Sequence, residues 1–428
     1  MTTARPAPVH IDDYAQPRFS PEVAAIRESV IPLAAELRLE TGPLLAAAGA
    51  ATGLDDFGAP DFERRLDLLL RALREQAGLS PFGVVSNHTF ILGLLESRLR
   101  IEDLLRRHPE IEQVPLERPI FIVGLPRTGT THLHNLISAD PTLRSLPYWE
   151  SLEPVPPASE RGCLPDPRRA RTQLAVDWID AVMPLFKRMH EMTVDHVHEE
   201  IQLLAIDFSS MLFESTAYVP AVRDDYQARD QTPHYRYLRR ILQILSWFDL
   251  EQERAAGRVA PEPRRWVLKS PQHSEQLPVL ARVFPDATFV VTHREPVAVT
   301  ASVVSMITYG ARMSVEHPDP MLYGRYWAAR VEDLLRGCAR DRDVLPAART
   351  IDVRFDDYMR DDIAMVERVY EVAGQPFTEA TRAAMQSFMA KHPRGRHGTI
   401  IQSLADFGLD PAERRRALAF YAERFGVG

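Results

Sequence analysis

The stretch FIVGLPRTGTTHLHNLI, residues 121–137, decides how this chain is expected to fold. Its first residues are apolar and β-branched, as in a strand that is buried on both faces, and the run ends at Gly124. Its last residues form an amphipathic run that favours a helix. A glycine-rich turn joins the two halves. The stretch therefore predicts a strand, a tight turn and a helix in direct succession.

The turn keeps the G-x-x-x-x-G spacing and the final hydroxyl of a phosphate-binding loop. Gly124 and Gly129 permit the tight turn, and the helix that follows presents its positive end to an anion. Thr130 stands where such loops carry a lysine, and Arg127 supplies a cation instead. We expect an anion site here, the alternative being a capped turn without a ligand. The missing lysine argues against hydrolysis of ATP or GTP.

Three further segments have the composition of strands, and helical patterns lie between them. This alternation predicts a doubly wound, parallel α/β sheet. The expected strands are 265–270, 287–294 and 349–358, and the expected helices are 274–284 and 295–307.

The domain organisation follows from where these patterns begin. Residues 20–112 show helical periodicity without a comparable strand signal. We therefore expect a helical N-terminal region over residues 1–115 and an α/β domain over residues 116–428. A mostly helical cap at about 172–250 is expected between two strands of that domain.

Composition limits the classes of function. The 428 residues carry a net charge of −8, which argues against a broad nucleic-acid-binding face. Two cysteines are too few for a disulfide framework and indicate a reducing compartment. The N-terminus reads as a polar, proline-rich arm, and nowhere do ~18 apolar residues run uninterrupted. We expect a cytoplasmic protein without a membrane segment.

Two more segments combine basic residues with turn-forming residues. Arg294 follows an expected strand directly, and Ser302 comes eight residues later. Because loops at the carboxyl ends of parallel strands meet at one crevice, this pair is a candidate second phosphate site. The alternative is a surface arginine that caps a helix. The stretch KHPRGRHGT places Arg394, Gly395 and Arg396 in a third candidate anion loop, the alternative being a solvated loop.

In this order the three segments resemble the sulfotransferases that use 3'-phosphoadenosine 5'-phosphosulfate (PAPS). GLPRTGTT is similar to their 5'-phosphosulfate loop, HREPVAVTAS to their 3'-phosphate segment, and PRGRHG to the loop that closes over the cofactor. VRFDDYMRDD, PYWESLEP, WVLKSPQH and LADFGLD extend the resemblance from about Pro119 to Leu409, closest to a bacterial branch with a helical N-terminal region.

The resemblance implies a three-layer, P-loop-like α/β fold, PAPS as the sulfuryl donor, and no metal. It explains the absent lysine, because sulfuryl transfer requires positioning and a cation at the leaving oxygen rather than a magnesium-bridged triphosphate. Arg127 suits that role. The implied cofactor-binding residues are Arg127, Thr128, Gly129, Thr130, Thr131, Arg294, Ser302, Arg394, Gly395 and Arg396.

An acceptor hydroxyl loses its proton as it attacks sulfur, which requires a base. Glu150 matches by position the glutamate of relatives with a carboxylate base, the alternative being a structural carboxylate tied to Arg144. His273 is the second candidate. Cytosolic relatives carry a histidine at the second position after the lysine that Lys269 matches, whereas here Pro271 occupies that position. Lys269 itself is expected to contact the transferred group.

Glu199 and Glu200 are the third candidates for the base. Together with Asp195, His196 and His198 they also have the composition of metal ligands. His196 and Glu200 would share a helix face, if a helix begins that early. We favour a capped helix start over a metal site, because no partner motif supplies further ligands.

The acceptor is expected to be a hydroxyl, or an amine, of a small molecule, lipid or glycan. Phe208, Met211, Phe213 and Tyr218 in the expected cap favour an apolar or aromatic alcohol. Two alternatives stay open at this point: a P-loop-like kinase that uses ATP and magnesium, and a non-catalytic nucleotide-binding protein. A homo-oligomer is compatible with the sequence.

Overall fold

The computed structural model describes residues 6–428, and its centre is a five-stranded parallel sheet in the order β3-β4-β2-β5-β6. The strand expected at 349–358 stops at Arg354, because the next residues form the short helix α16 (Phe355–Arg360), whose first turn carries acidic residues that favour a helix start. The strands are β2 (Ile120–Val123), β3 (Leu143–Arg144), β4 (Arg265–Ser270), β5 (Thr288–His293) and β6 (Thr350–Arg354).

The sheet separates two apolar cores, because successive side chains of a strand point to opposite faces. In β2, Ile120 and Ile122 enter one core, and Phe121 and Val123 enter the other. This arrangement confirms the predicted three-layer α/β fold. The first face is covered by α6 (Thr130–Ser138), α17 (Asp362–Ala373) and α18 (Glu379–Lys391), and the second by α13 (Leu277–Val283), α14 (Pro296–Gly310) and α15 (Pro320–Asp341).

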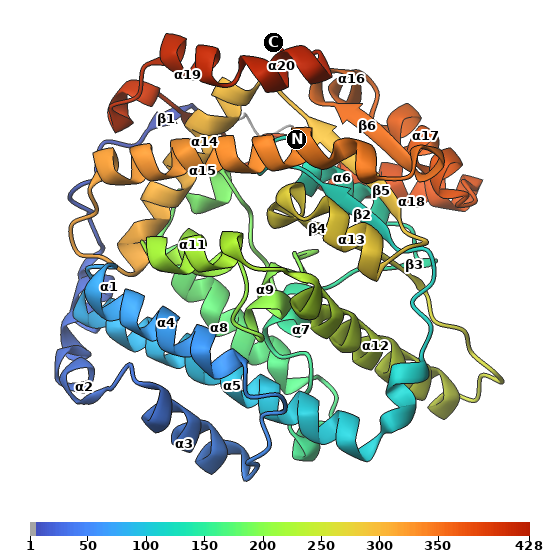
Figure 1. Cartoon of the computed structure of the whole chain (residues 1–428), viewed down its shortest axis with the longest axis horizontal. Coiled ribbons are helices and arrows are strands. Elements are labelled where there is room, and N and C mark those ends of the chain that lie inside the picture. The colour runs from blue at the N-terminus through green and yellow to red at the C-terminus, as the bar shows by residue number, and fades with distance from the viewer. Residues whose placement is uncertain (1–5) are drawn as a thin grey trace.

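The N-terminal region is helical, as predicted, and lies beside the α/β layers (Figure 1). The second of the two cores runs from Ile11 to Val427 and includes the buried leucines of α4. The N-terminal helices therefore share their core with the rest of the chain. These helices are α1 (Pro21–Ser29), α2 (Ile31–Glu36), α3 (Thr41–Thr52), α4 (Phe62–Glu75) and α5 (Pro81–Arg107).

The expected cap lies between β3 and β4 in the chain and contains an irregular segment, residues 183–200. His198 donates its N–H to Leu146 at 2.7 Å, and Tyr148 donates to the carbonyl of His196 at 2.9 Å. This pairing keeps the segment out of a helix, and the next helix begins only at Ile201, so the condition for His196 and Glu200 to share a helix face is not met. The helices here are α7 (Tyr148–Leu152), α8 (Pro167–Val182), α9 (Ile201–Ala205), α10 (Leu212–Thr216), α11 (Pro220–Ala228) and α12 (Thr232–Ala255).

The two ends of the chain meet in a small parallel sheet that the sequence did not predict. β1 (Val9–His10) pairs with β7 (Ile400–Ile401), directly after the third basic segment. The chain ends in α19 (Pro411–Ala417) and α20 (Ala419–Phe425). Across residues 6–428, no helix combines the length and the apolar composition needed to cross a bilayer.

Candidate active site

A cavity of about 1190 Å³ lies at the carboxyl ends of the central strands. Its wall includes a residue that follows each of four strands: Leu125 after β2, Pro271 after β4, Arg294 after β5 and Phe355 after β6. Ligands bind in this position in open parallel sheets, at the carboxyl ends of the strands. The cavity is therefore the candidate active site.

The glycine-rich turn forms one end of this cavity. Gly129 has a φ of 88°, and a Cβ added there would lie 3.3 Å from the ring of Phe355. A Cβ on Gly124 would lie 2.0 Å from Thr292 Oγ1, a severe clash. Arg127 takes a left-handed backbone conformation with a φ of 73°, which is uncommon for a residue with a side chain. The turn is thus a tightly constrained loop that opens into α6.

Arg127 and Ser302, predicted from distant segments, lie in direct contact. Arg127 donates from Nε to Ser302 Oγ at 3.0 Å and from Nη1 to the carbonyl of Met189 at 2.5 Å. Arg294 donates to the carbonyl of Arg127 at 2.6 Å. Burial and the charge of Arg294 lower the pKa of Arg127, so an anion between the two guanidinium groups would relieve their repulsion. The first two predicted anion segments form one cationic end of the cavity.

The third basic segment also reaches this cavity. Arg394, Gly395 and Arg396 line it, and Arg394 pairs with Asp362. Arg396 pairs with Glu191 in the irregular segment of the cap. The loop is therefore held from both sides of the cavity, by α17 and by the cap.

The threonines of the turn divide into two kinds. Thr128 is buried and its Oγ1 hydrogen-bonds the carbonyl of Leu125 and Thr292 Oγ1, each at 2.7 Å, so its hydroxyl fixes the loop. Thr130 is also buried and begins α6. Thr131 lines the cavity, and its Oγ1 lies 3.4 Å from Lys269 Nζ. Of the three hydroxyls, that of Thr131 faces the space where a ligand would bind.

Lys269, which is buried, and Glu199, which is partly exposed, form an ion pair next to Thr131. The ammonium of Lys269 contacts Glu199 Oε1, and the side chain of Lys269 is only 2% exposed. Glu199 lines the cavity. Lys269 belongs to β4, and Glu199 lies two residues before α9 in the cap. The ion pair, together with the contact of Lys269 with Thr131, therefore links the glycine-rich turn to the cap.

The carboxylate of Glu150 does not belong to the cavity wall. Arg144 donates from Nη2 to both of its oxygens, at 2.9 and 2.7 Å, and Arg144 also pairs with Asp249 at 2.9 Å. Burial raises the pKa of Glu150, and Arg144 acts in the opposite direction. This geometry matches the structural alternative that the sequence left open for Glu150.

His273 and Glu200 are likewise buried behind the cavity wall. His273 Nε2 lies 2.5 Å from Glu200 Oε1, and Tyr235 Oη lies 2.8 Å from Nδ1 of the same ring. The second oxygen of Glu200 accepts the backbone N–H of Lys269 at 2.9 Å. Although burial alone would raise it, the pKa of Glu200 is lowered by His273 and these hydrogen bonds. Both ring nitrogens of His273 therefore have hydrogen-bond partners within the fold. The His273–Glu200 pair connects the residues around the end of β4 to the cap.

Residues 119–379 match the model of the sulfotransferase family. The chain belongs to the sulfotransferase family. It is similar to the omega-hydroxy-beta-dihydromenaquinone-9 sulfotransferase Stf3 of Mycobacterium bovis and of Mycobacterium tuberculosis, with 22% identity over 297 residues, 66% of this chain and 69% of the relative.

Two solved sulfotransferase structures share most of the fold. STF9 from Mycobacterium avium superposes with a TM-score of 0.79 and 27% identity over 92% of this chain and 98% of that protein. STF1 from Mycobacterium tuberculosis superposes with a TM-score of 0.73 and 29% identity over 88% of this chain and 97% of that protein. The helical N-terminal region is therefore shared with these sulfotransferases, because the matches cover nearly the whole chain.

The remainder of the cavity in this sulfotransferase is mainly apolar and rich in methionine. Met211 lines it, as expected from the sequence, whereas Phe208 and Phe213 are buried and stack on each other with ring centroids 6.1 Å apart. Tyr218 packs against Tyr326. Further apolar lining comes from Trp178, Met183, Met189, Met306 and Met313.

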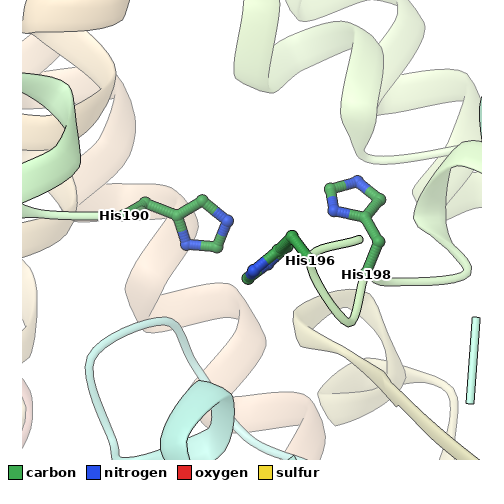
Figure 2. Close-up of side chains that lie close together, drawn as sticks. All are labelled: His190, His196 and His198. Atoms are coloured by element: carbon green, nitrogen blue, oxygen red, sulfur yellow. The ribbon is translucent and has the colours of Figure 1, made fainter. Parts of the chain in front are cut away.

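Three histidines on the cavity wall form a cluster (Figure 2). Ring centroids lie 5.1 Å apart for His190 and His196 and 5.7 Å apart for His196 and His198. Burial lowers the pKa of His196 to about 4 and holds the pKa values of the other two well below the ordinary value, with Lys269 adding to the effect. The cluster is therefore uncharged at neutral pH.

Some contacts in the site were missed at the sequence level. Gln402 donates to Ser302 Oγ at 2.7 Å, from beside β7. His132, at the start of α6, lies 2.5 Å from the hydroxyl of Tyr358 and lines the cavity. His190 carried no ligand-like spacing with His196 and His198, although the density of histidines over nine residues was a usable signal.

Proposed function

We propose that this protein transfers a sulfuryl group from PAPS to the hydroxyl of an apolar, lipid-like acceptor. The proposal depends above all on the convergence of Arg127, Arg294 and the loop of Arg394–Arg396 on one end of a cavity whose remainder is apolar. A cationic end suits the phosphates and sulfate of the donor, and methionine side chains adapt to a flexible apolar ligand.

Donor binding would use the turn and its two neighbouring segments. The first-turn N–H groups of α6 and the guanidinium of Arg127 would hold the 5'-phosphosulfate. Arg294 and Ser302 would hold the 3'-phosphate, and the loop of Arg394–Arg396 would close over the nucleotide. Arg127 would stabilise the negative charge that develops on the leaving oxygen, which is the larger part of catalysis for such a transfer.

For the base we propose Glu199, in place of Glu150 and His273. Glu199 lines the cavity and contacts Lys269, which in turn reaches Thr131 of the turn. When the sulfuryl group arrives, Lys269 would turn toward its oxygens, and the released carboxylate would accept the proton of the acceptor hydroxyl. The pair thus couples occupation of the donor site to activation of the acceptor.

The acceptor class is inferred from the cavity and from a relative. The relative Stf3 is a sulfotransferase of a hydroxylated dihydromenaquinone, a lipid-like alcohol. Methionine and tryptophan side chains line the same cavity as the proposed base, which favours an acceptor of the same chemical kind.

Calorimetry tests the donor. The purified protein should bind 3'-phosphoadenosine 5'-phosphate and show no comparable heat with ATP and magnesium. Arg127→Ala should weaken this binding by about 10- to 150-fold, the value of a hydrogen bond to a charged group, and Arg127→Lys, which keeps the charge, should fall between. Arg258→Ala, at an exposed arginine outside the cavity, is the matched control. Tight binding of ATP with magnesium, and none of the bisphosphate, would favour a kinase.

Turnover is tested separately with the full chain. Labelled PAPS is incubated with the protein and a fractionated metabolite extract, and the label should appear in an apolar alcohol. Binding of the bisphosphate without any labelled product from polar or apolar fractions would instead favour a non-catalytic nucleotide-binding protein.

A further inference from the structure

The cluster of His190, His196 and His198 is the feature of the cavity that the proposed transfer does not use. No residue of the donor-binding segments belongs to it, and it lines the same cavity as Glu199 and the methionine side chains, close enough to Lys269 for that ammonium to lower the pKa of His196. Figure 2 shows the ring of His196 between the other two, with His190 approaching from the side opposite His198.

We infer that these three histidines bind one divalent transition-metal ion of the zinc class. One ring nitrogen from each residue lies within 4.8 Å of those of the other two. Metal–nitrogen bonds of 2.0–2.1 Å place such nitrogens roughly 3.3 Å apart, so the rings need to close by no more than roughly 1.5 Å. All three belong to the irregular segment 183–200, whose side chains are not held on a rigid helix.

The hydrogen bonding of the cluster supports the assignment. His196 Nε2 and His198 Nδ1 are buried and have no hydrogen-bond partner within the described residues. His198 is only 7% exposed, so leaving its nitrogen unpaired costs free energy unless a ligand occupies the space. Uncharged imidazole is the form that coordinates metals.

The nature of the ligands selects the ion. Imidazole nitrogens without carboxylates favour zinc, cobalt, nickel or copper over magnesium or calcium. The nearest ammonium, that of Lys269, is already paired with Glu199, which reduces its repulsion of a cation. Three protein ligands leave a coordination position open to the cavity, as in catalytic zinc sites. The site would open toward the acceptor side, with the donor loop next to it, because Arg127 bonds the carbonyl of Met189, the residue before His190.

Metal binding by itself tests this inference. Protein without a histidine tag is freed of metal with a chelator and titrated with Co²⁺, and zinc is measured by competition with a coloured chelator. We expect one ion per chain and the strong visible absorption of four-coordinate Co²⁺. His196→Gln should weaken binding by more than about 100-fold, since even loss of an outer partner of a ligand costs 10- to 100-fold. His317→Gln, at an exposed histidine outside the cavity, should bind as the wild type does.

Three results would overturn the inference: no stoichiometric ion in the wild type, unchanged binding in folded His196→Gln, or loss of turnover in that variant while the wild type holds no metal. The last would make the histidines acid–base or acceptor-binding groups. If His196→Gln does not fold, the test is the rate at which diethyl pyrocarbonate modifies the three histidines of the wild type, with and without zinc. Zinc should protect all three histidines, and equal labelling with and without zinc refutes the site. The metal titration and the histidine labelling do not require that the proposed sulfuryl transfer be correct.

Discussion

Arg127 combines a strained backbone with a fixed side chain. A non-glycine residue in the left-handed region costs of the order of 1–3 kcal/mol and persists where its surroundings determine it. Here Ser302 and the carbonyl of Met189 hold the guanidinium, from α14 and from the cap. A single side chain thus connects the turn with two distant segments, which is the geometry expected of a preorganised anion site.

At the same scale, Glu199 and Glu150 make a matched pair of carboxylates. Glu199→Gln should lower kcat by about 10²- to 10⁴-fold, because a general base contributes that much, and should leave the affinity for the bisphosphate nearly unchanged. Glu150→Gln should keep turnover within about threefold and mainly lower stability, because Glu150 is bound to Arg144. Turnover is measured with the labelled acceptor. The reverse pattern in folded proteins would return the role of base to Glu150.

His132 gives a pH dependence of stability. Burial, and to a smaller degree Arg394, lowers its pKa to about 4, whereas Asp362 opposes the shift. The unfolded chain, with a pKa near 6.5, binds a proton that the folded state does not bind between pH 6.5 and 4, so stability falls as the pH drops through this range. Urea unfolding at pH 7 and pH 5 should show that the free energy of unfolding falls by about 2 kcal/mol more in the wild type than in His132→Asn. Equal losses would contradict the pKa shift.

At the scale of elements, the basic loop after α18 is held by contacts from elsewhere. Arg396 and His397 both contact Glu191 of the cap, and Gly398 is followed by the residues that pair with β1. The irregular segment that carries Glu191 also carries His190. The ion pairs with Glu191 therefore attach the basic loop of Arg394–Arg396, which we propose closes over the donor, to the segment that carries the histidines of the cavity wall.

Glu191→Gln should loosen this loop. Loss of a half-exposed ion pair costs about 0.2–1 kcal/mol, so hydrogen exchange of the amides around Gly395–Gly398 should become about 2- to 5-fold faster. Glu367→Gln, which removes the partner of Arg382 on the α18 surface, is the control and should leave these amides unchanged. Unchanged exchange in Glu191→Gln would mean that backbone contacts alone hold the loop.

At the scale of the whole molecule, a buried charge network joins the N-terminal helices to the cap. Asp207 accepts from Arg65 of α4 at 2.9 Å and from Arg98 of α5 at 2.8 Å, and its second oxygen lies 2.5 Å from His234 of α12. Although burial alone would raise it, the pKa of Asp207 is lowered by His234 and the two arginines. The helical region is thus bound to the cap by charge as well as by a shared apolar core.

Neighbouring arginines on α4 test this network. Arg65→Ala breaks a buried pair and should lower the free energy of unfolding by about 3–5 kcal/mol. Arg64, whose side chain is 44% exposed, pairs with Asp225, and Arg64→Ala should cost less than about 1 kcal/mol. Urea unfolding of the full chain measures both. Similar losses in the two variants would show that the network adds no more than a surface pair.

Periodicity and turn chemistry predicted most of the fold. The helical N-terminal region and the parallel strands at 265–270 and 287–294 were recognisable, and so were the three basic segments that line one cavity, whose binding of anions stays a prediction. The edge strand β3 and the pairing of β1 with β7 were missed, because each has two residues and too little pattern to detect. The end of β6 was misplaced because apolar alternation continued into α16.

The sequence alone determined which residues could form an anion site, because glycine spacing, hydroxyls and arginines are local features with a fixed geometry. Only the tertiary structure decided which carboxylates and histidines face the cavity. Glu150, Glu199 and Glu200 are equally plausible by composition, yet burial and partners separate them: Arg144 holds the first, the second lines the cavity, and His273 holds the third. The physical reason is that a side chain's partners come from segments far apart in the chain, and their proximity exists only once the chain has folded.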